Sequence, residues 1–243
     1  RVHESAAVWT IYHAIDSETA NPFQAYQATR YVDTAIPHIP VTAHGLKENG
    51  YATIATTNWL PYSWSINNVA FAEVMHTALS YFQAGRADAG YKLLKSSVLD
   101  GMYLGDSPGN FGQISFYDAA RGECYRDFGD PIGVASRVLI QGLFGILPDA
   151  LNKQIILRPG FPADWDKASV STPDISYRFT RKEDTDTYHI TQRFQTPLHP
   201  VLQINARKEK IRSVKVNDVP ATWQSIESAH GYPLLSIQAE GTS

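Results

Sequence analysis

The chain has 243 residues, of which 43% are hydrophobic, 12% aromatic and 19% charged, and its formal net charge is -3. This charge does not favour nucleic acid as a partner, because phosphate binding needs a concentrated surface of Lys and Arg. The low charged fraction and high aromatic content are typical of a chain that buries a core, and they exclude a disordered segment or a coiled coil. No apolar run reaches the roughly 18–20 residues that cross a bilayer, and we recognise no signal-peptide pattern.

Helical periodicity dominates the first 150 residues. The sequence predicts helices over 22–35, 68–84, 87–99 and 131–147. Asn21 suits an N-cap and Pro22 a first helical turn. Gly85 suits a stop between the second and third helices, which together read as an antiparallel αα-hairpin. The helix over 68–84 is apolar on most of its sides.

After residue 150 the hydrophobic period becomes two. Short β-branched or aromatic stretches, bounded by Pro, Gly, Asn and Asp, predict strands over 155–158, 175–180, 187–194, 201–206, 212–216 and 234–239. Such a series of strands is typical of an antiparallel β-sandwich. We therefore expect two domains, a helical one over 1–152 and a β-sandwich over 153–243.

An aromatic-rich segment, T-T-N-W-L-P-Y-S-W-S-I, begins at Thr56. Trp59, Tyr62 and Trp64 fall where the helical pattern does not need them. Aromatic rings outside helices suit sugar binding, because the C–H face of a pyranose packs on a ring while groups such as Asn58 bond to its hydroxyls. The structural alternative is that these rings attach a loop to the core.

A second polar stretch, G-Q-I-S-F-Y-D-A-A-R-G-E-C-Y-R-D-F-G-D, covers residues 112–130. Carboxyl groups among large aromatic side chains and arginines have perturbed pKa values, which acid and base catalysis requires. Asp118 and Glu123 are the candidate catalytic residues, and we expect them to share a concavity with Trp59 or Trp64. The candidate substrate-binding residues of this stretch are Tyr117, Arg126 and Asp127. The alternative is a solvated loop with surface ion pairs, with Asp130 as the cap of the next helix.

The sequence contains no motif for the other types of site that we considered. No His, Asp and Cys spacing predicts a metal site, and neither a G-x-S-x-G elbow nor a Walker loop occurs, so we expect no metal and no cofactor. His13 reads as part of a polar connection, and we include it among the substrate-binding candidates. Cys124 reads as an inert cysteine.

The order of these features resembles the C-terminal end of six-hairpin (α/α)6 glycoside hydrolases. This superfamily includes bacterial α-L-rhamnosidases, inverting α-L-fucosidases and large glycosidase-like proteins of gut bacteria. Three segments carry the resemblance: G-Q-I-S-F-Y-D, L-F-G-I-L-P-D and I-I-L-R-P-G-F-P-A-D-W. The first is similar to the G-x-T-T-x-W-E segment that supplies the catalytic base in rhamnosidase-like members. Gly112 and Ser115 match its Gly and second Thr, while Tyr117 replaces its Trp and Asp118 its Glu.

The resemblance implies a partial (α/α)6 toroid of αα-hairpins followed by a β-sandwich. It implies inverting hydrolysis of a plant or host glycan, with Asp118 as base and a general acid from a missing half of the toroid. About five helices form only an arc, so we expect the missing N-terminal portion or a second copy to cover the helix over 68–84. The resemblance also implies a periplasmic or extracellular location.

Two other functions stay open. One is a non-catalytic carbohydrate-binding or scaffold protein on the same fold. The other is a sugar epimerase or lyase, which would use His13 and Tyr117.

Overall fold

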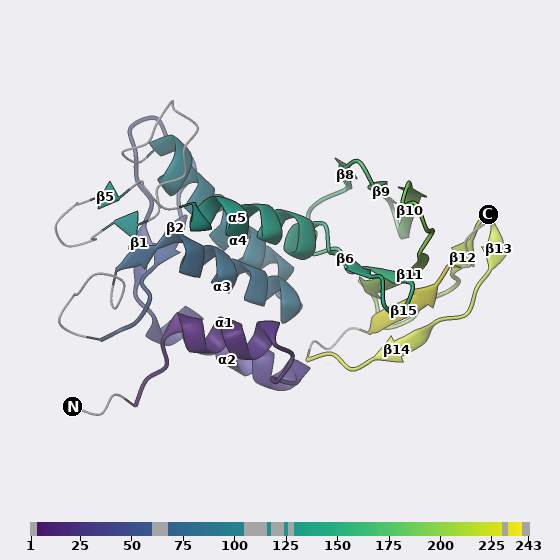
Figure 1. Ribbon diagram of the computed structural model, residues 1–243, viewed down its shortest axis with the longest axis horizontal. Helices are drawn as coiled ribbons and strands as arrows, with labels where there is room; N and C mark the ends of the chain where they lie inside the picture. The colour runs from purple at the N-terminus through teal and green to yellow at the C-terminus, as the bar shows by residue number, and fades with distance from the viewer. Residues whose placement is uncertain are drawn as a thin grey trace. The chain divides into compact units, whose positions relative to one another are not determined.

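The computed structural model combines five α-helices with several sheets among the residues that it describes, so the chain is a mixed α and β protein (Figure 1). It describes residues 4–59, 68–104, 116–117, 124–125, 129–229 and 233–239, with the backbone alone at 104, 116–117 and 124–125. Two compact units divide between residues 142 and 143 rather than between 152 and 153. Within the described ranges, no helix has the length and apolar character to cross a membrane.

The helical unit is built from five α-helices and short strands. Its helices are α1 (Val8–Asp16), α2 (Pro22–Ala35), α3 (Phe71–Gln83), α4 (Ala87–Val98) and α5 (Asp130–Arg137), and wide π-helical turns extend α4 as η1 (Leu99–Leu104) and α5 as η2 (Val138–Leu143). Its strands are β1 (His38–Pro40), β2 (Ala52–Ile54), β3 (Val69–Ala70), β4 (Phe116–Tyr117) and β5 (Cys124–Tyr125). They form the antiparallel pair β1–β2 and the sheet β3–β4–β5.

Local signals explain the ends of two helices. The side chain of Asn21 accepts a hydrogen bond from the Gln24 amide at 2.9 Å, and the Gln24 side chain accepts one from the Asn21 amide at 3.0 Å. This capping box and Pro22 begin α2 where the sequence predicts it. Gly85, with φ +75°, ends α3 and leads into α4, so the predicted hairpin is confirmed.

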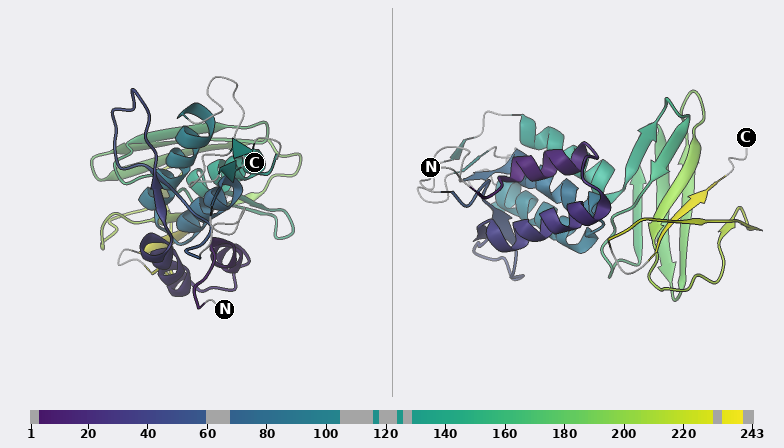
Figure 2. Two further views of the ribbon diagram at one scale, coloured as in Figure 1. Left: turned by 90° about the vertical axis from the view of Figure 1, so that its left-hand side faces the viewer. Right: turned by 90° about the horizontal axis from the view of Figure 1, so that it is seen from below.

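Helix α3 forms the centre of the helical unit. Ten of its side chains are buried, among them Phe71, Met75 and Leu79. The helices α1, α2, α4 and α5 all contact α3 (Figure 2). The expectation that α3 needs a partner to cover it was therefore wrong, because helices of the same chain bury it.

The second unit contains ten strands among its described residues. They are β6 (Ile146–Asp149), β7 (Gln154–Leu157), β8 (Lys167–Ser171), β9 (Ile175–Lys182), β10 (Thr185–Gln192), β11 (His199–Asn205), β12 (Lys215–Val216), β13 (Val219–Pro220), β14 (Gln224–Ile226) and β15 (Leu234–Gln238). One sheet has the order β14-β15-β11-β7-β6, a second has the order β10-β9-β8, and β12 pairs with β13.

Two features of this unit differ from the predicted antiparallel sandwich. Strand β7 pairs with β11 in parallel, although the other pairs are antiparallel. Ile146 and Leu147 belong to strand β6 instead of the end of the predicted helix over 131–147, because β6 pairs with β7. This pairing draws Ile146–Asp149 into the β unit, which explains why the boundary lies earlier than expected.

Each strand of the second sheet alternates between more exposed and more buried side chains. Ile175, Tyr177 and Phe179 of β9 are buried, and the residues between them point the other way. Phe161 lies against Phe179 with ring centroids 5.0 Å apart, and it stacks on Trp165. An aromatic cluster therefore fills the core side of β9.

Candidate functional site

Two of the predicted sugar-binding residues lie beside the start of the chain. The Ser5 hydroxyl donates to the amide oxygen of Asn58 at 2.9 Å, and the indole N–H of Trp59 donates to the Ser5 hydroxyl at 2.8 Å. The ring of Trp9 meets that of Trp59 edge to face at 6.1 Å. Asn58 is exposed and Trp59 half-buried. Because the Trp59 N–H already donates within the protein, Trp59 would contact a sugar through the face of its ring.

The sheet β3–β4–β5 connects this segment with the second polar stretch. The Thr56 amide donates to the Asn68 carbonyl at 3.0 Å, and the next residue, Val69, pairs with Tyr117. Tyr117 in turn pairs with Cys124. Three segments that are distant in the sequence therefore meet along one short sheet.

Most of the predicted site lies outside the described residues. Tyr117 is described by its backbone alone. The structure does not describe six further candidates, Tyr62, Trp64, Asp118, Glu123, Arg126 and Asp127. The concavity that we expect these residues to share with Trp59 stays a prediction.

The sequence suggested that His13 lies in a polar connection. The structure places it on helix α1 instead. The signal for this helix was present, since Val8, Ile11, Tyr12 and Ile15 follow helical spacing and are buried. No side chain caps its first turn, so its start carried no sequence marker. The His13 side chain is exposed, and its ring lies 4.6 Å from that of Tyr12.

His13 belongs to a cluster of titratable side chains on three helices, which the sequence analysis did not recognise. The other members are Asp16 on α1, Glu73 and His76 on α3, and Asp130 and Arg137 on α5. The buried Tyr12 lies inside it, with its ring stacked on His76 at 4.6 Å. We call this set the three-helix cluster.

Glu73 is a carboxyl group of the three-helix cluster whose pKa is shifted upward. Burial raises its pKa above the ordinary value; a hydrogen bond from its own backbone lowers it, the charge of Asp130 raises it and His13 lowers it. The net shift is upward. Burial, together with the charge of Glu73, also raises the pKa of Tyr12 to about 12, so that phenol stays protonated and cannot serve as a base. The raised pKa means that Glu73 holds its proton more readily than an ordinary glutamate, which is the direction that a general acid needs.

An ion pair supports the far end of the cluster. Arg137 donates to both carboxylate oxygens of Asp16, at 2.7 and 2.8 Å, and Gln83 donates to one of them at 2.8 Å. Burial would raise the pKa of Asp16, but these hydrogen bonds and the Arg137 charge together hold it below the ordinary value. Burial and Arg137 lower the pKa of His76, and Asp16 partly opposes this, so His76 loses its proton more readily than an ordinary histidine.

The cluster thus combines a carboxyl group whose pKa is raised, Glu73, with a carboxylate whose pKa Arg137 lowers, Asp16. Such contrast suits acid and base chemistry. Within the described part of the chain, no group of three His, Cys, Asp or Glu side chains is arranged to hold a metal ion.

Comparison with models of known protein families finds no match to this chain, and comparison with curated proteins finds none either.

Proposed function

We propose that this chain is a portion of an inverting glycoside hydrolase, in which α1 to α5 form an arc of an (α/α)6 toroid and the β unit forms a sandwich. The observation that carries the proposal is the half-buried carboxyl group of Glu73, whose pKa burial and the charge of Asp130 raise. The α3–α4 hairpin and the half-exposed ring of Trp59 also support it.

Inverting hydrolysis needs an acid and a base carboxyl group, roughly 6.5–9.5 Å apart, on opposite sides of the sugar. We assign the acid to Glu73 and keep Asp118 as the base. Glu73 lies in the first turn of α3, which follows β3 directly. Asp118 follows Tyr117, whose backbone pairs with Val69 of β3. This assignment removes the need for a general acid from a missing half, and Glu123 then serves to bind sugar hydroxyls.

The test uses aryl glycosides whose leaving groups differ in acidity. Glu73→Gln should slow hydrolysis of poor leaving groups by roughly 10²–10⁴-fold, because these need a proton. It should slow glycosides of acidic phenols far less, because these leave without one. Asp118→Asn should slow both kinds alike. Glu48→Gln is the control, since Glu48 is an exposed carboxylate outside the cluster.

A role for Glu73 in structure alone gives a different result. In that case Glu73→Gln would slow both kinds of substrate equally or neither. Stability offers a second readout. A raised pKa means that the folded state binds more protons than the unfolded state, so ionised Glu73 destabilises the fold at neutral pH. Glu73→Gln should therefore be more stable than the wild type at pH 7, and this difference should vanish below about pH 4.

The alternative function is a non-catalytic carbohydrate-binding or scaffold protein. The exposed amide of Asn58 beside the ring of Trp59 favours it, since this pair binds a sugar without any acid. Binding of an oligosaccharide that Trp59→Ala weakens and Glu73→Gln does not, without release of any product, would support this alternative.

A glycan substrate is consistent with a periplasmic or extracellular location, which is part of the proposal. The proposal also includes a partner, either the remainder of the toroid or a second copy. Ile132 and Leu139, which remain 53% and 43% exposed near α5, are apolar positions that such a partner would cover. Light scattering with size-exclusion chromatography tests this point, and a monomer near 27 kDa without a copurifying chain would contradict it.

A further inference from the structure

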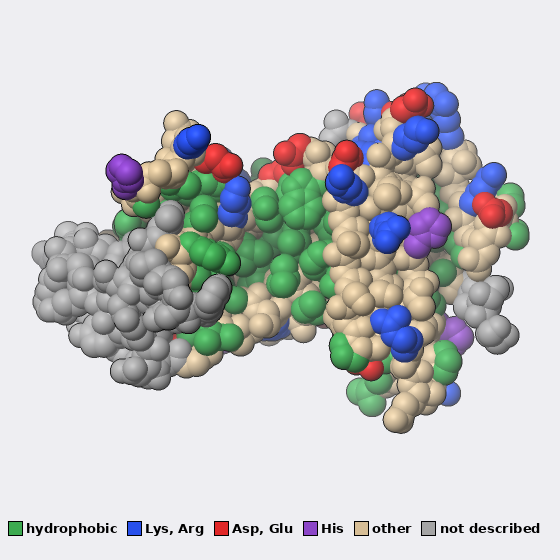
Figure 3. Space-filling view, turned by 90° about the horizontal axis from the view of Figure 1, so that it is seen from above, with side chains coloured by type: hydrophobic (Ala, Val, Ile, Leu, Met, Phe, Trp, Pro, Cys, Tyr) green, Lys and Arg blue, Asp and Glu red, His purple; other side chains and the backbone are tan. Residues whose placement is uncertain are grey.

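The exposed face of the sheet β10-β9-β8 has an unusual composition. Its central positions are Ser169, Ser171, Ser176, Arg178, His189 and Thr191, which we call the polar face. All are exposed except Ser176, which is half-buried. The remaining outward positions of the three strands hold only Thr and Lys. This surface therefore carries hydroxyl and cationic groups without any carboxylate or apolar side chain on its strands (Figure 3).

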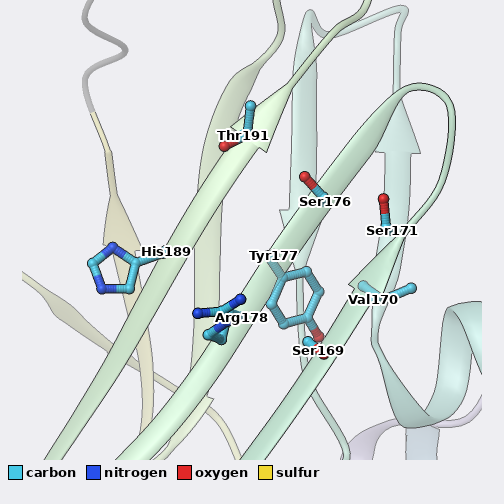
Figure 4. A pocket seen from close by; sticks show the side chains of 8 residues that line it. All are labelled: Ser169, Val170, Ser171, Ser176, Tyr177, Arg178, His189 and Thr191. Carbon is cyan, nitrogen blue, oxygen red and sulfur yellow. The ribbon is translucent and has the colours of Figure 1, made fainter.

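Strand pairing arranges the polar face in two rows. Arg178 on the central strand pairs with Ser169 on one side and His189 on the other, and Ser176 pairs with Ser171 and Thr191. Neighbouring strands lie about 4.8 Å apart, and the two rows are about 7 Å apart along the strands. A depression of about 550 Å³ lies over these rows, and Val170 and Tyr177 also contribute to its lining. Figure 4 shows Arg178 between His189 and Ser169.

Arg178 differs from the other arginines of this sheet. Arg181 donates to both oxygens of Asp186, at 3.0 and 3.2 Å. Arg193 donates to the carbonyls of the turn before β9 and to the Ser176 hydroxyl of the polar face, at 3.3 Å. Among the described residues, Arg178 makes no side-chain hydrogen bond and no ion pair. Its guanidinium retains five donors in a planar fork that matches a carboxylate or a sulfate.

We propose that the polar face binds an anionic polysaccharide. Arg178 pairs with a carboxylate or sulfate group of the polymer, and the Ser and Thr hydroxyls bond to its sugar hydroxyls. The inference goes beyond the glycosidase proposal and does not depend on it, because the face contains none of the proposed catalytic residues.

The composition of the face favours a polysaccharide over other anionic partners. Single-stranded nucleic acid binds to aromatic rings on which its bases stack, and the outward positions of these strands hold none. Duplex binding needs a denser set of cations than this face offers in a chain of net charge -3. A surface that binds an anionic membrane gains affinity by inserting apolar side chains into it, and these outward positions hold none.

Isothermal titration calorimetry on the full chain tests the proposal with three galactose-family polymers. Polygalacturonate offers carboxylates, carrageenan offers sulfates, and a neutral β-1,4-galactan offers neither. We expect binding to at least one anionic polymer, weakening with added salt because exposed charges are screened. Which of the two binds identifies the anionic group.

Variants then locate the site. Arg178→Ala should weaken binding roughly tenfold, because it removes a charge-assisted hydrogen bond. Arg212→Ala removes another exposed arginine, outside the three strands, and should leave the affinity unchanged. If Arg178→Ala alters the melting temperature, Ser169→Ala with Thr191→Ala tests the same face. Equal binding of the neutral galactan, unchanged affinity in the face variants, or a preference for an oligonucleotide or for phosphatidylserine vesicles would overturn the proposal.

Discussion

The contact between Asp16 and Arg137 connects α1 with α5, residues that are 121 positions apart in the sequence. Replacing Asp16 with Ala removes two hydrogen bonds from Arg137 and one from Gln83, and it leaves the guanidinium without this partner. The change should destabilise the helical unit, because the three-helix cluster loses the carboxylate that holds its far end together.

The expected cost follows from the exposure of the pair. A hydrogen bond to a charged group contributes about 1.5–3 kcal/mol when water is excluded, whereas an exposed ion pair contributes about 0–1 kcal/mol. The side chains of Arg137 and Asp16 are 35% and 25% exposed, which lies between these limits. We therefore expect Asp16→Ala to lower the free energy of unfolding by about 1–2 kcal/mol.

Urea unfolding of the wild type, Asp16→Ala, Arg137→Ala and the double variant measures this contact directly. The double-mutant cycle should give a coupling of about 1 kcal/mol. Asp184→Ala is the control, because Asp184 and Lys208 lie 3.9 Å apart with both side chains at least 70% exposed, and it should change nothing measurable. A coupling within about 0.3 kcal/mol of zero would refute the reasoning.

The same contact predicts a dependence on pH. The pKa of Asp16 is depressed in the folded state, so the unfolded state binds more protons in acid. The stabilisation is present above the unfolded pKa of about 3.9 and is lost as the pH falls through the folded pKa. The difference between the wild type and Asp16→Ala should therefore be constant near neutral pH and shrink below about pH 4.

Two further predictions concern the backbone. Gly145 has φ +64°, and a Cβ there would lie 1.9 Å from the Arg158 carbonyl oxygen, so Gly145→Ala should destabilise the β unit by about 3–5 kcal/mol in urea unfolding. Gly133→Ala, with nothing within 4 Å of its Cβ, should be neutral or stabilising, and equal effects of the two would contradict this account. Asn21→Ala should cost about 1 kcal/mol in the same assay through loss of the α2 cap, whereas Gln27→Ala on the exposed side of α2 should cost little. A cap variant as stable as wild type would show that packing alone defines the start of α2.

The sequence predicted the features that depend on neighbours in the chain. The cap of Asn21 and the first-turn Pro22 predict the start of α2, because the groups that end a helix lie within one turn of it. The alternation of apolar and polar residues predicts β9, because successive side chains of a strand point to opposite faces. The change from helical to strand period near residue 150 predicts two units of different class.

Tertiary structure decided the features that depend on distant partners. Ile146–Asp149 is a strand because β7 pairs with it, and β7 lies parallel to β11, which no local pattern encodes. Glu73 looks like any exposed carboxylate of a first helical turn until α1 and α5 pack beside it. Its raised pKa is a consequence of desolvation and of a charge 57 residues away, at Asp130. Periodicity records which side of an element is buried, but burial of one charged group beside another arises only when separate elements pack together.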